Sequence, residues 1–177
     1  MLKVFQLRTA RSVLGLGVRD IGVYIDLSRS TISKIERRDL NSTLNITQEQ
    51  NVTLIKIFND KGVFFPDKNT ISYGNTHRAY SQFLTRFQLR GSRAILALSQ
   101  RELSGSLCIE KNILNYLENL SNDSYIATTE EYQLIINSKL KNYFNKKNIS
   151  FPNDYTISVN FNGASPQGNC MKDQIQK

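Results

Sequence analysis

A run of basic and hydroxyl side chains between Ser28 and Arg38 contains the residues of this chain best suited to binding a polyanion. The run holds four basic residues, Arg29, Lys34, Arg37 and Arg38, against the single acid Glu36, which gives a formal charge of +3. Arginine and lysine bind guanine O6 and N7 as well as phosphate oxygens, and hydroxyl groups bind phosphate. Presented on one face of a helix, such groups could contact the base edges and backbone of a nucleic acid.

The sequence contains no comparable pattern of residues for a catalytic site or a metal site. His77 is the only histidine and falls in a predicted linker, and Cys108 and Cys170 lack the paired spacing of a zinc site or a disulfide framework. The segment Gly15-Leu16-Gly17 lacks the third glycine and the preceding strand of a dinucleotide-binding loop. We therefore expect no catalytic residue, no metal and no cofactor, and the chain is not expected to be an enzyme.

Three helices are predicted to position the basic run. Residues 3–14 and 18–25 carry apolar side chains at helical spacing. Asp26 falls in the turn that follows, and aspartate tolerates the left-handed backbone conformation that such turns require. Ser28 can cap the third helix, which runs to about Arg37, because its hydroxyl can accept a hydrogen bond from the free amides of the first turn.

A fourth helix and a strand-forming segment complete this part of the chain. Thr47-Gln48-Glu49-Gln50 has the pattern of a capping box at the start of a helix, and Gly62 is a natural stop for that helix. Residues 63–73 are rich in aromatic and β-branched side chains around Pro66-Asp67-Lys68-Asn69. This composition predicts a small hairpin or two short strands.

The same order of elements is written a second time. Phe5-Gln6-Leu7-Arg8 recurs 82 residues later as Phe87-Gln88-Leu89-Arg90, and nine of the 32 positions from Phe5 to Glu36 are identical at that shift. Phe65-Pro66 and Thr70-Ile71-Ser72 recur at a shift of 86. The second copy predicts helices near 80–96, 100–107, 110–118 and 129–146, and strands within 149–159. We expect a mostly α chain made of two tandem helical units, each followed by short β-strands.

One stretch of the first copy is similar to a known family. Its residues are Leu7-Arg8-Thr9-Ala10-Arg11, Gly15-Leu16, Asp20-Ile21 and Leu27-Ser28-Arg29-Ser30-Thr31-Ile32-Ser33-Lys34-Ile35-Glu36. They closely resemble the Cro/phage-repressor-like helix-turn-helix family, also called the xenobiotic-response-element type. The resemblance implies two tandem lambda-repressor-like helix-turn-helix bundles whose third helix enters the DNA major groove. The DNA-contacting residues that it nominates in the first copy are Arg19, Ser28, Arg29, Ser30, Ser33, Lys34 and Arg37.

The second copy keeps the framework but differs on the surface that would face DNA. The residues nominated there are Gln100, Lys111, Asn112, Asn115 and Tyr116. Glu110 stands where the first copy has the capping Ser28, and residues 110–120 carry one basic and two acidic residues, a net charge of −1. Because phosphate neutralisation dominates affinity for DNA, the first copy is expected to bind more strongly. The second copy could be a second reader or mainly a dimerisation module.

Four charged residues recur in both copies as two pairs. In the family that the chain resembles, an arginine of the first helix pairs with a glutamate at the end of the reading helix. The resemblance therefore implies structural ion pairs between Arg11 and Glu36 and between Arg93 and Glu118, in preference to a catalytic role. Arg8 and Arg90 are predicted to be either phosphate contacts or ordinary surface residues.

Length and charge limit the organisation of the chain. The 177 residues carry a net charge of +8, which suits a polyanion such as nucleic acid. The repeat predicts domains at 1–73 and 80–160, joined by a linker at 74–79 and followed by a disordered tail at 161–177. The apolar runs are too short to cross a bilayer. We expect a cytoplasmic chain with no membrane contact.

Together these features predict a sequence-specific, repressor-like transcription regulator whose partner is double-stranded DNA. The alternative is a protein-interaction module, such as an antitoxin or an antagonist of another regulator, with the second copy serving dimerisation. The matched segments 63–73 and 149–159 are expected to pair, because isolated hairpins are marginal and unpaired strand edges seek partners. They could pair within one chain as an intramolecular pseudo-dimer or between two chains as a homodimer. The short linker favours pairing within one chain.

Overall fold

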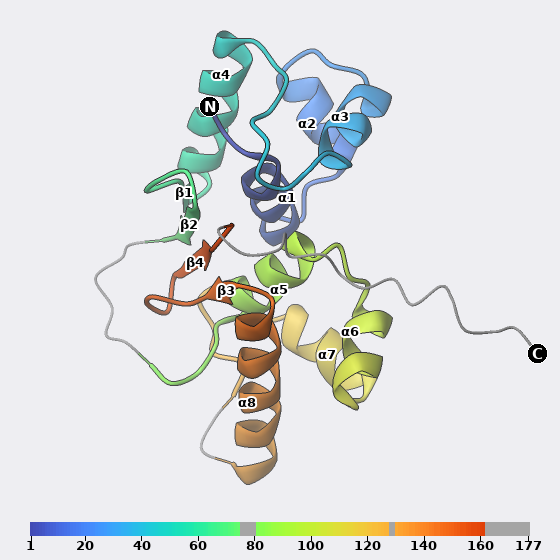
Figure 1. Cartoon of the computed structure of the whole chain (residues 1–177), viewed down its shortest axis with the longest axis vertical. Helices are drawn as coiled ribbons and strands as arrows, with labels where there is room; N and C mark the ends of the chain where they lie inside the picture. Colours follow the sequence, from blue (N-terminus) through green and yellow to red (C-terminus); the bar gives the residue numbers. More distant parts are fainter. Residues whose placement is uncertain (75–80, 128–129, 162–177) are drawn as a thin grey trace, which may run out of the picture.

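A computed structural model describes residues 1–74, 81–127 and 130–161 of the chain (Figure 1). These residues contain eight α-helices and four short β-strands. The first repeat contains α1 (Val4–Val13), α2 (Val18–Tyr24), α3 (Arg29–Glu36), α4 (Gln48–Asp60), β1 (Val63–Phe64) and β2 (Thr70–Tyr73). The second contains α5 (Arg86–Ile95), α6 (Gln100–Leu107), α7 (Lys111–Glu118), α8 (Glu131–Lys146), β3 (Ile149–Ser150) and β4 (Thr156–Val159). The predicted mostly α chain with short strands after each helical segment is confirmed.

The first helix of the second repeat is shorter than the sequence predicted. We expected a helix near 80–96, but α5 begins at Arg86. Thr85, whose backbone is extended, caps the helix, because its amide donates to Gln88 Oε1 at 2.9 Å and its hydroxyl accepts from the Gln88 amide at 3.3 Å. A capping box of this kind fixes the start of a helix.

The structure shows where the offset between the two repeats changes from 82 to 86 residues. Lys3 and Thr85 form equivalent isolated bridges with Thr43 and Tyr125, which are 82 residues apart. The buried side chains of Asn51 and Asn137, which are 86 residues apart, accept equivalent hydrogen bonds from the backbone just before α1 and α5, at 2.8 and 2.9 Å. The four additional residues of the second repeat therefore lie between Tyr125 and Asn137, around the start of α8.

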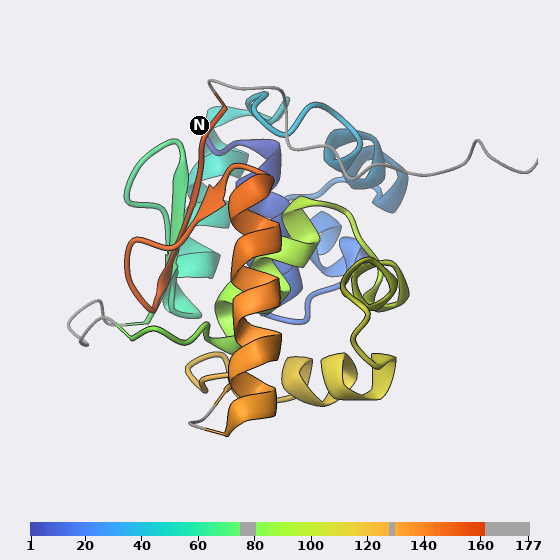
Figure 2. The same ribbon diagram turned by 60° about the horizontal axis from the view of Figure 1, so that its bottom comes forward.

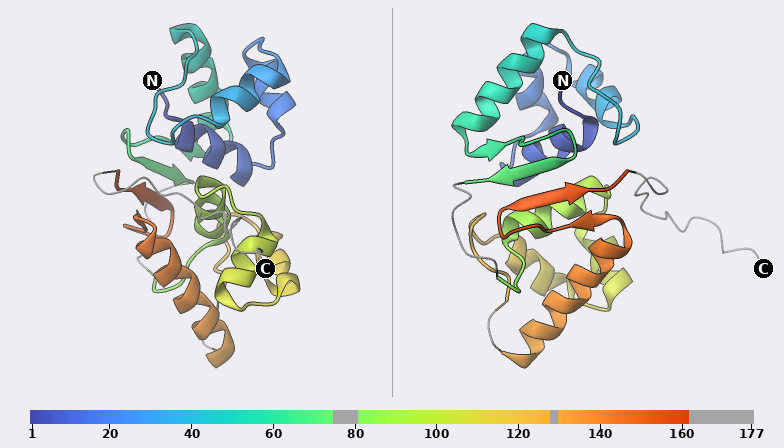
Figure 3. Two further views of the ribbon diagram at one scale, coloured as in Figure 1. Left: turned by 45° about the vertical axis from the view of Figure 1, so that its right-hand side comes forward. Right: turned by 60° about the vertical axis from the view of Figure 1, so that its left-hand side comes forward.

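The four strands form one antiparallel sheet in the order β1-β2-β4-β3, so the two repeats share it (Figure 3). At the central pairing of β2 with β4, Thr70 lies opposite Ser158, Ile71 opposite Ile157 and Ser72 opposite Thr156. At the 86-residue shift Thr70 corresponds to Thr156 and Ser72 corresponds to Ser158. The Thr70–Ser158 and Ser72–Thr156 pairs are therefore equivalent, and the pairing is symmetric about Ile71 and Ile157. The segments 63–73 and 149–159 pair within one chain, as the favoured alternative predicted, and a local twofold axis passes through this sheet.

The same axis passes through the contact between α1 and α5. The two helices pack against each other, and Thr9 and Gly91, which are equivalent residues of the two repeats, meet there. A Cβ atom added to Gly91 would lie 3.0 Å from Thr9 Cγ2 and 2.5 Å from Ile157 Cδ1. Two identical side chains on a twofold axis would occupy the same space, and the glycine in one repeat makes room for the threonine of the other.

Aromatic side chains cross between the repeats on either side of this axis. Tyr73 stacks on Phe87 with ring centroids 5.6 Å apart, and Phe161 packs at 5.5 Å on Phe5, the equivalent of Phe87. Phe161 also lies under the ammonium of Lys3, 5.0 Å from the ring centroid. The prediction that the disordered tail begins at Phe161 is therefore wrong at that residue. The rest of the predicted tail, 162–177, and linker residues 75–79 with His77 lie outside the described residues.

Both repeats contribute large side chains to one hydrophobic core. Phe5 and Phe58 in the first repeat and Phe87 and Phe144 in the second are all fully buried. Figure 2 shows α8 running along the second repeat, and α4 occupies the corresponding place in the first (Figure 1). Among the described residues, no helix is both long and apolar enough to cross a membrane.

Candidate nucleic-acid interface

A tight turn sets α3 against α2 in the first repeat. The Leu27 amide donates to the Gly22 carbonyl at 2.9 Å, and a Cβ atom at Gly22 would lie only 2.3 Å from the Leu27 oxygen. Asp26 adopts the left-handed conformation at φ 51°, as its position in the turn predicted. In the second repeat Cys108 takes the same conformation, also at φ 51°. Both repeats therefore hold their second and third helices through a turn of the same backbone shape.

The third helix of the first repeat presents most of its predicted DNA-contacting residues to solvent. Ser28 caps it, since its hydroxyl accepts from the Thr31 amide at 3.1 Å, and Ile32 and Ile35 are buried beneath it. Of the nominated residues, Arg19, Ser28, Arg29, Ser30, Lys34 and Arg37 are exposed, and Ser33 is half-buried. The exposed side of α3 therefore carries two cations, Arg29 and Lys34, with Arg37 just past its end.

The equivalent surface of the second repeat has a different chemistry. Lys111, Asn112, Asn115 and Tyr116 are all exposed, and the large aromatic side chain of Tyr116 is 66% exposed. Glu110 precedes α7 but makes no side-chain hydrogen bond to its first turn. Gln100, predicted to meet a phosphate, donates a hydrogen bond from Nε2 to Glu118 Oε2 at 3.1 Å. A phosphate contact by Gln100 would therefore compete with an internal hydrogen bond.

An ion pair ties α1 to α3 in the first repeat. Arg11 Nε lies 2.6 Å from Glu36 Oε1, and Nη2 donates to Oε2 at 2.9 Å. The remaining Nη1 donates to the Leu16 carbonyl at 3.0 Å. One guanidinium thus joins the end of α1, the turn before α2 and the end of α3, as the predicted structural pair requires. Two parallel hydrogen bonds of this kind hold both partners in a fixed orientation.

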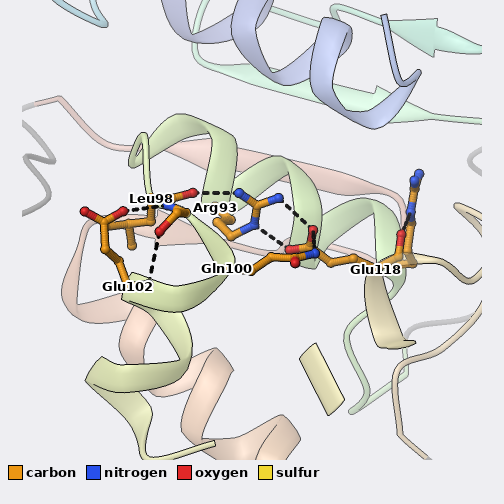
Figure 4. Close-up of polar contacts among 7 residues, drawn as sticks. Arg93, Leu98, Gln100, Glu102 and Glu118 are labelled. Atoms are coloured by element: carbon orange, nitrogen blue, oxygen red, sulfur yellow. Dashed lines mark hydrogen bonds and ion pairs between the residues drawn. The ribbon is translucent and has the colours of Figure 1, made fainter. Parts of the chain in front are cut away.

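The second repeat builds the same pair in a more buried form (Figure 4). Arg93 Nη2 donates to Glu118 Oε2 at 2.6 Å and Nη1 donates to the Leu98 carbonyl at 2.6 Å. The side chain of Glu118 is 4% exposed, whereas that of Glu36 is 11% exposed. With the bond from Gln100, the Glu118 carboxylate accepts from two side chains, so the second repeat has the tighter internal network.

Two further arginines, Arg8 and Arg90, lie beside these pairs and are half-buried. Burial is the main cause that lowers the pKa of both guanidinium groups, and the nearby glutamate of each repeat opposes it only in part. Arg90 Nε is buried and has no hydrogen-bond partner among the described residues. The sequence predicted these two residues as phosphate contacts or surface positions, and the structure shows that neither side chain is fully exposed.

Arg86 is a structural contact that sequence reasoning missed. Its Nη1 donates to the Val13 carbonyl at the end of α1 at 2.9 Å, and its Nε donates to the Glu118 carbonyl at 3.0 Å. Arg86 therefore joins the two repeats at the negative end of α1. Comparison of the two repeats could not predict this role of Arg86, because the equivalent residue of the first repeat is the apolar Val4.

Comparison of the chain with models of protein families, with curated protein sequences and with solved structures found no match. The likeness to a helix-turn-helix family consequently rests on the stretch from Leu7 to Glu36. In the described residues, no group of three or more histidine, cysteine or acidic side chains is placed to hold a metal ion. What the surface can do is argued below from the placement and charge of the residues just described.

Proposed function

We propose that the chain is a sequence-specific DNA-binding transcription regulator, repressor-like, with two helix-turn-helix units in one polypeptide. In each unit the third helix, α3 or α7, would enter the major groove while the second helix braces it. The observation that carries the proposal is the surface of α3. It combines exposed Arg29 and Lys34 with a hydroxyl-capped N-terminus and a rigid attachment to α1 through Arg11 and Glu36.

The arrangement of the two repeats supports the proposal. The helix pairs α2–α3 and α6–α7 lie on the side of the molecule away from the sheet (Figures 1 and 2). The sheet and the α1–α5 contact share a local twofold axis, which is the symmetry that palindromic half-sites match in dimeric regulators. One chain would therefore address two half-sites of one operator.

The two units are not equivalent in this proposal. Residues 28–38 carry a net charge of +3 and residues 110–120 a net charge of −1. Phosphate neutralisation supplies much of the affinity for DNA, so α3 contributes more than α7. The exposed Tyr116 and the acidic balance of residues 110–120 support the alternative for this unit alone, a contact with protein.

The test begins with selection of bound sequences by the full chain, or genomic footprinting, to define the operator. The double variant Arg29→Ala and Lys34→Ala should then lose roughly 1–3 kcal/mol per base contact, that is, roughly fivefold to more than a hundredfold in affinity for each. Lys111→Ala with Asn112→Ala should cost less. Lys56→Ala, an exposed cation on α4, is the matched control.

Far-UV circular dichroism must show unchanged helicity for each variant. Undiminished operator affinity of the Arg29 and Lys34 variant would refute the assignment of α3. A wild-type chain that selects no sequence, and binds every duplex weakly and alike, would favour the protein-interaction alternative.

A further inference from the structure

An open cleft of about 560 Å³ separates the two repeats where α1 and α5 end. Equivalent residues of the two repeats line it, Arg8 with Arg90 and Arg11 with Arg93, so the cleft lies on the local twofold axis. The third helix of the first repeat also lines it, through Ser33 and its C-cap residue Arg37. The cleft is thus continuous with the surface proposed to read DNA.

The charge of this cleft is unbalanced. Five arginines line it against one glutamate, Glu36. Arg11 is neutralised by Glu36, and Arg93 by Glu118, through the ion pairs described above. Among the described residues, no ion pair neutralises Arg8, Arg90 or Arg37. Three guanidinium groups therefore line one space without an ion-pair partner of their own among these residues.

The two inner arginines are Arg8 and Arg90, and Arg90 has a buried donor without an acceptor in the described part of the chain. The half-buried guanidinium groups of Arg8 and Arg90 have lowered pKa values because burial disfavours their charge, and the buried Nε of Arg90 lacks a hydrogen-bond acceptor. A buried donor without an acceptor is costly, and an anion placed between the two groups would satisfy it. Guanidinium groups bind phosphate oxygens with paired, charge-assisted hydrogen bonds.

We propose that the cleft between the repeats is a phosphate-binding site, with Arg8, Arg90 and Arg37 as its ligand-binding residues. The phosphate could belong to the DNA backbone between two half-sites or to a free small molecule that carries several phosphates. The volume suits a free small molecule, since small-molecule sites commonly measure about 300–1,000 Å³. The DNA form rests on the proposed function, whereas the small-molecule form does not.

The experiment uses the full chain and two ligands. Wild type and the variants Arg8→Gln, Arg90→Gln, their combination, and Arg37→Gln are titrated calorimetrically with pyrophosphate in the absence of DNA. In parallel, the affinity for the selected operator is measured over a series of salt concentrations. Lys56→Gln is the control, because it removes one exposed positive charge on α4, away from the cleft. Exposed Arg37 provides a variant that leaves the half-buried Arg8 and Arg90 in place should the double variant lose its helical signal.

A DNA phosphate in the cleft predicts that the slope of log affinity against log salt falls by about 0.9 for each arginine removed. A free phosphorylated ligand predicts that pyrophosphate binds to wild type and that the double variant binds it at least tenfold more weakly. The proposal is overturned if pyrophosphate binding and the salt slope of the cleft variants match those of Lys56→Gln. If wild type binds no DNA, the proposed function fails, and pyrophosphate binding alone then decides for or against the cleft.

Discussion

The two repeats use the same internal contacts to build different surfaces. Arg11 and Glu36 in the first repeat correspond to Arg93 and Glu118 in the second, and both arginines also bond the carbonyl that precedes the second helix. Gln6 shows the same correspondence with Gln88, since each side chain donates to backbone carbonyls of the strand segment of its own repeat. The exposed residues of α3 and α7, in contrast, share little.

The difference separates what the fold requires from what a ligand would require. A buried polar group must be hydrogen-bonded in every copy of the framework, so its partners recur. An exposed side chain can bond to water and needs no fixed partner. The exposed Lys34 of the first repeat therefore corresponds to an exposed tyrosine, Tyr116, in the second. The shared framework and the unlike surfaces agree with the proposal that the two repeats contribute unequally to DNA binding.

The largest expected effect tests the unequal burial of the two ion pairs. Glu118→Ala should lower the free energy of unfolding by about 3–5 kcal/mol, because it leaves the Arg93 guanidinium and the Gln100 amide without their acceptor. Glu36→Ala should cost about 2–3 kcal/mol, because Arg11 is more exposed and water can solvate part of its charge. Chemical denaturation of the full chain measures both. A greater loss for Glu36→Ala would show that the second network is not the tighter one.

A smaller effect is expected where the two repeats meet on the axis. Gly91→Ala should destabilise the chain by about 1–3 kcal/mol, because the added methyl group would press on Ile157 Cδ1 and Thr9 Cγ2. Ile157→Val removes the nearer of these atoms and should recover part of the loss in the double variant. Thermal or chemical denaturation gives the coupling between the two changes. Additive losses would mean that the helices move apart to accommodate the alanine, and that the contact does not fix their approach.

The smallest effect concerns the caps of the two third helices. Ser28 caps α3, whereas Glu110 makes no side-chain hydrogen bond to the first turn of α7. Glu110→Ser should therefore stabilise the chain by about 0.5–1 kcal/mol, and Ser28→Ala should destabilise it by a similar amount. Both changes are read from the midpoint of denaturation. A stability loss on Glu110→Ser would indicate that the glutamate already serves α7 through its charge near the positive end of the helix.

Sequence by itself determined the features that depend on neighbouring residues or on the repeat. The apolar spacing and the caps at Ser28 and Thr47 predicted α1 to α4 to within a few residues, because such signals act within one or two helical turns. The resemblance to the helix-turn-helix family implied both ion pairs, and the recurrence of Arg11 with Glu36 at the same separation fitted a structural role. The matched strand segments predicted their own pairing, since each leaves an edge that the other can cover.

Only the tertiary structure decided how the repeats meet. Gly91 had no evident purpose in the sequence until its place against Thr9 and Ile157 was known. Arg86 had no counterpart in the first repeat, and Arg8 and Arg90 are brought to one cleft only by the crossing of α1 and α5. The physical reason is that such contacts join residues 66 to 82 positions apart, whose separation follows no helical or strand period. Their proximity results from the packing of whole helices about the shared axis, which no local pattern records.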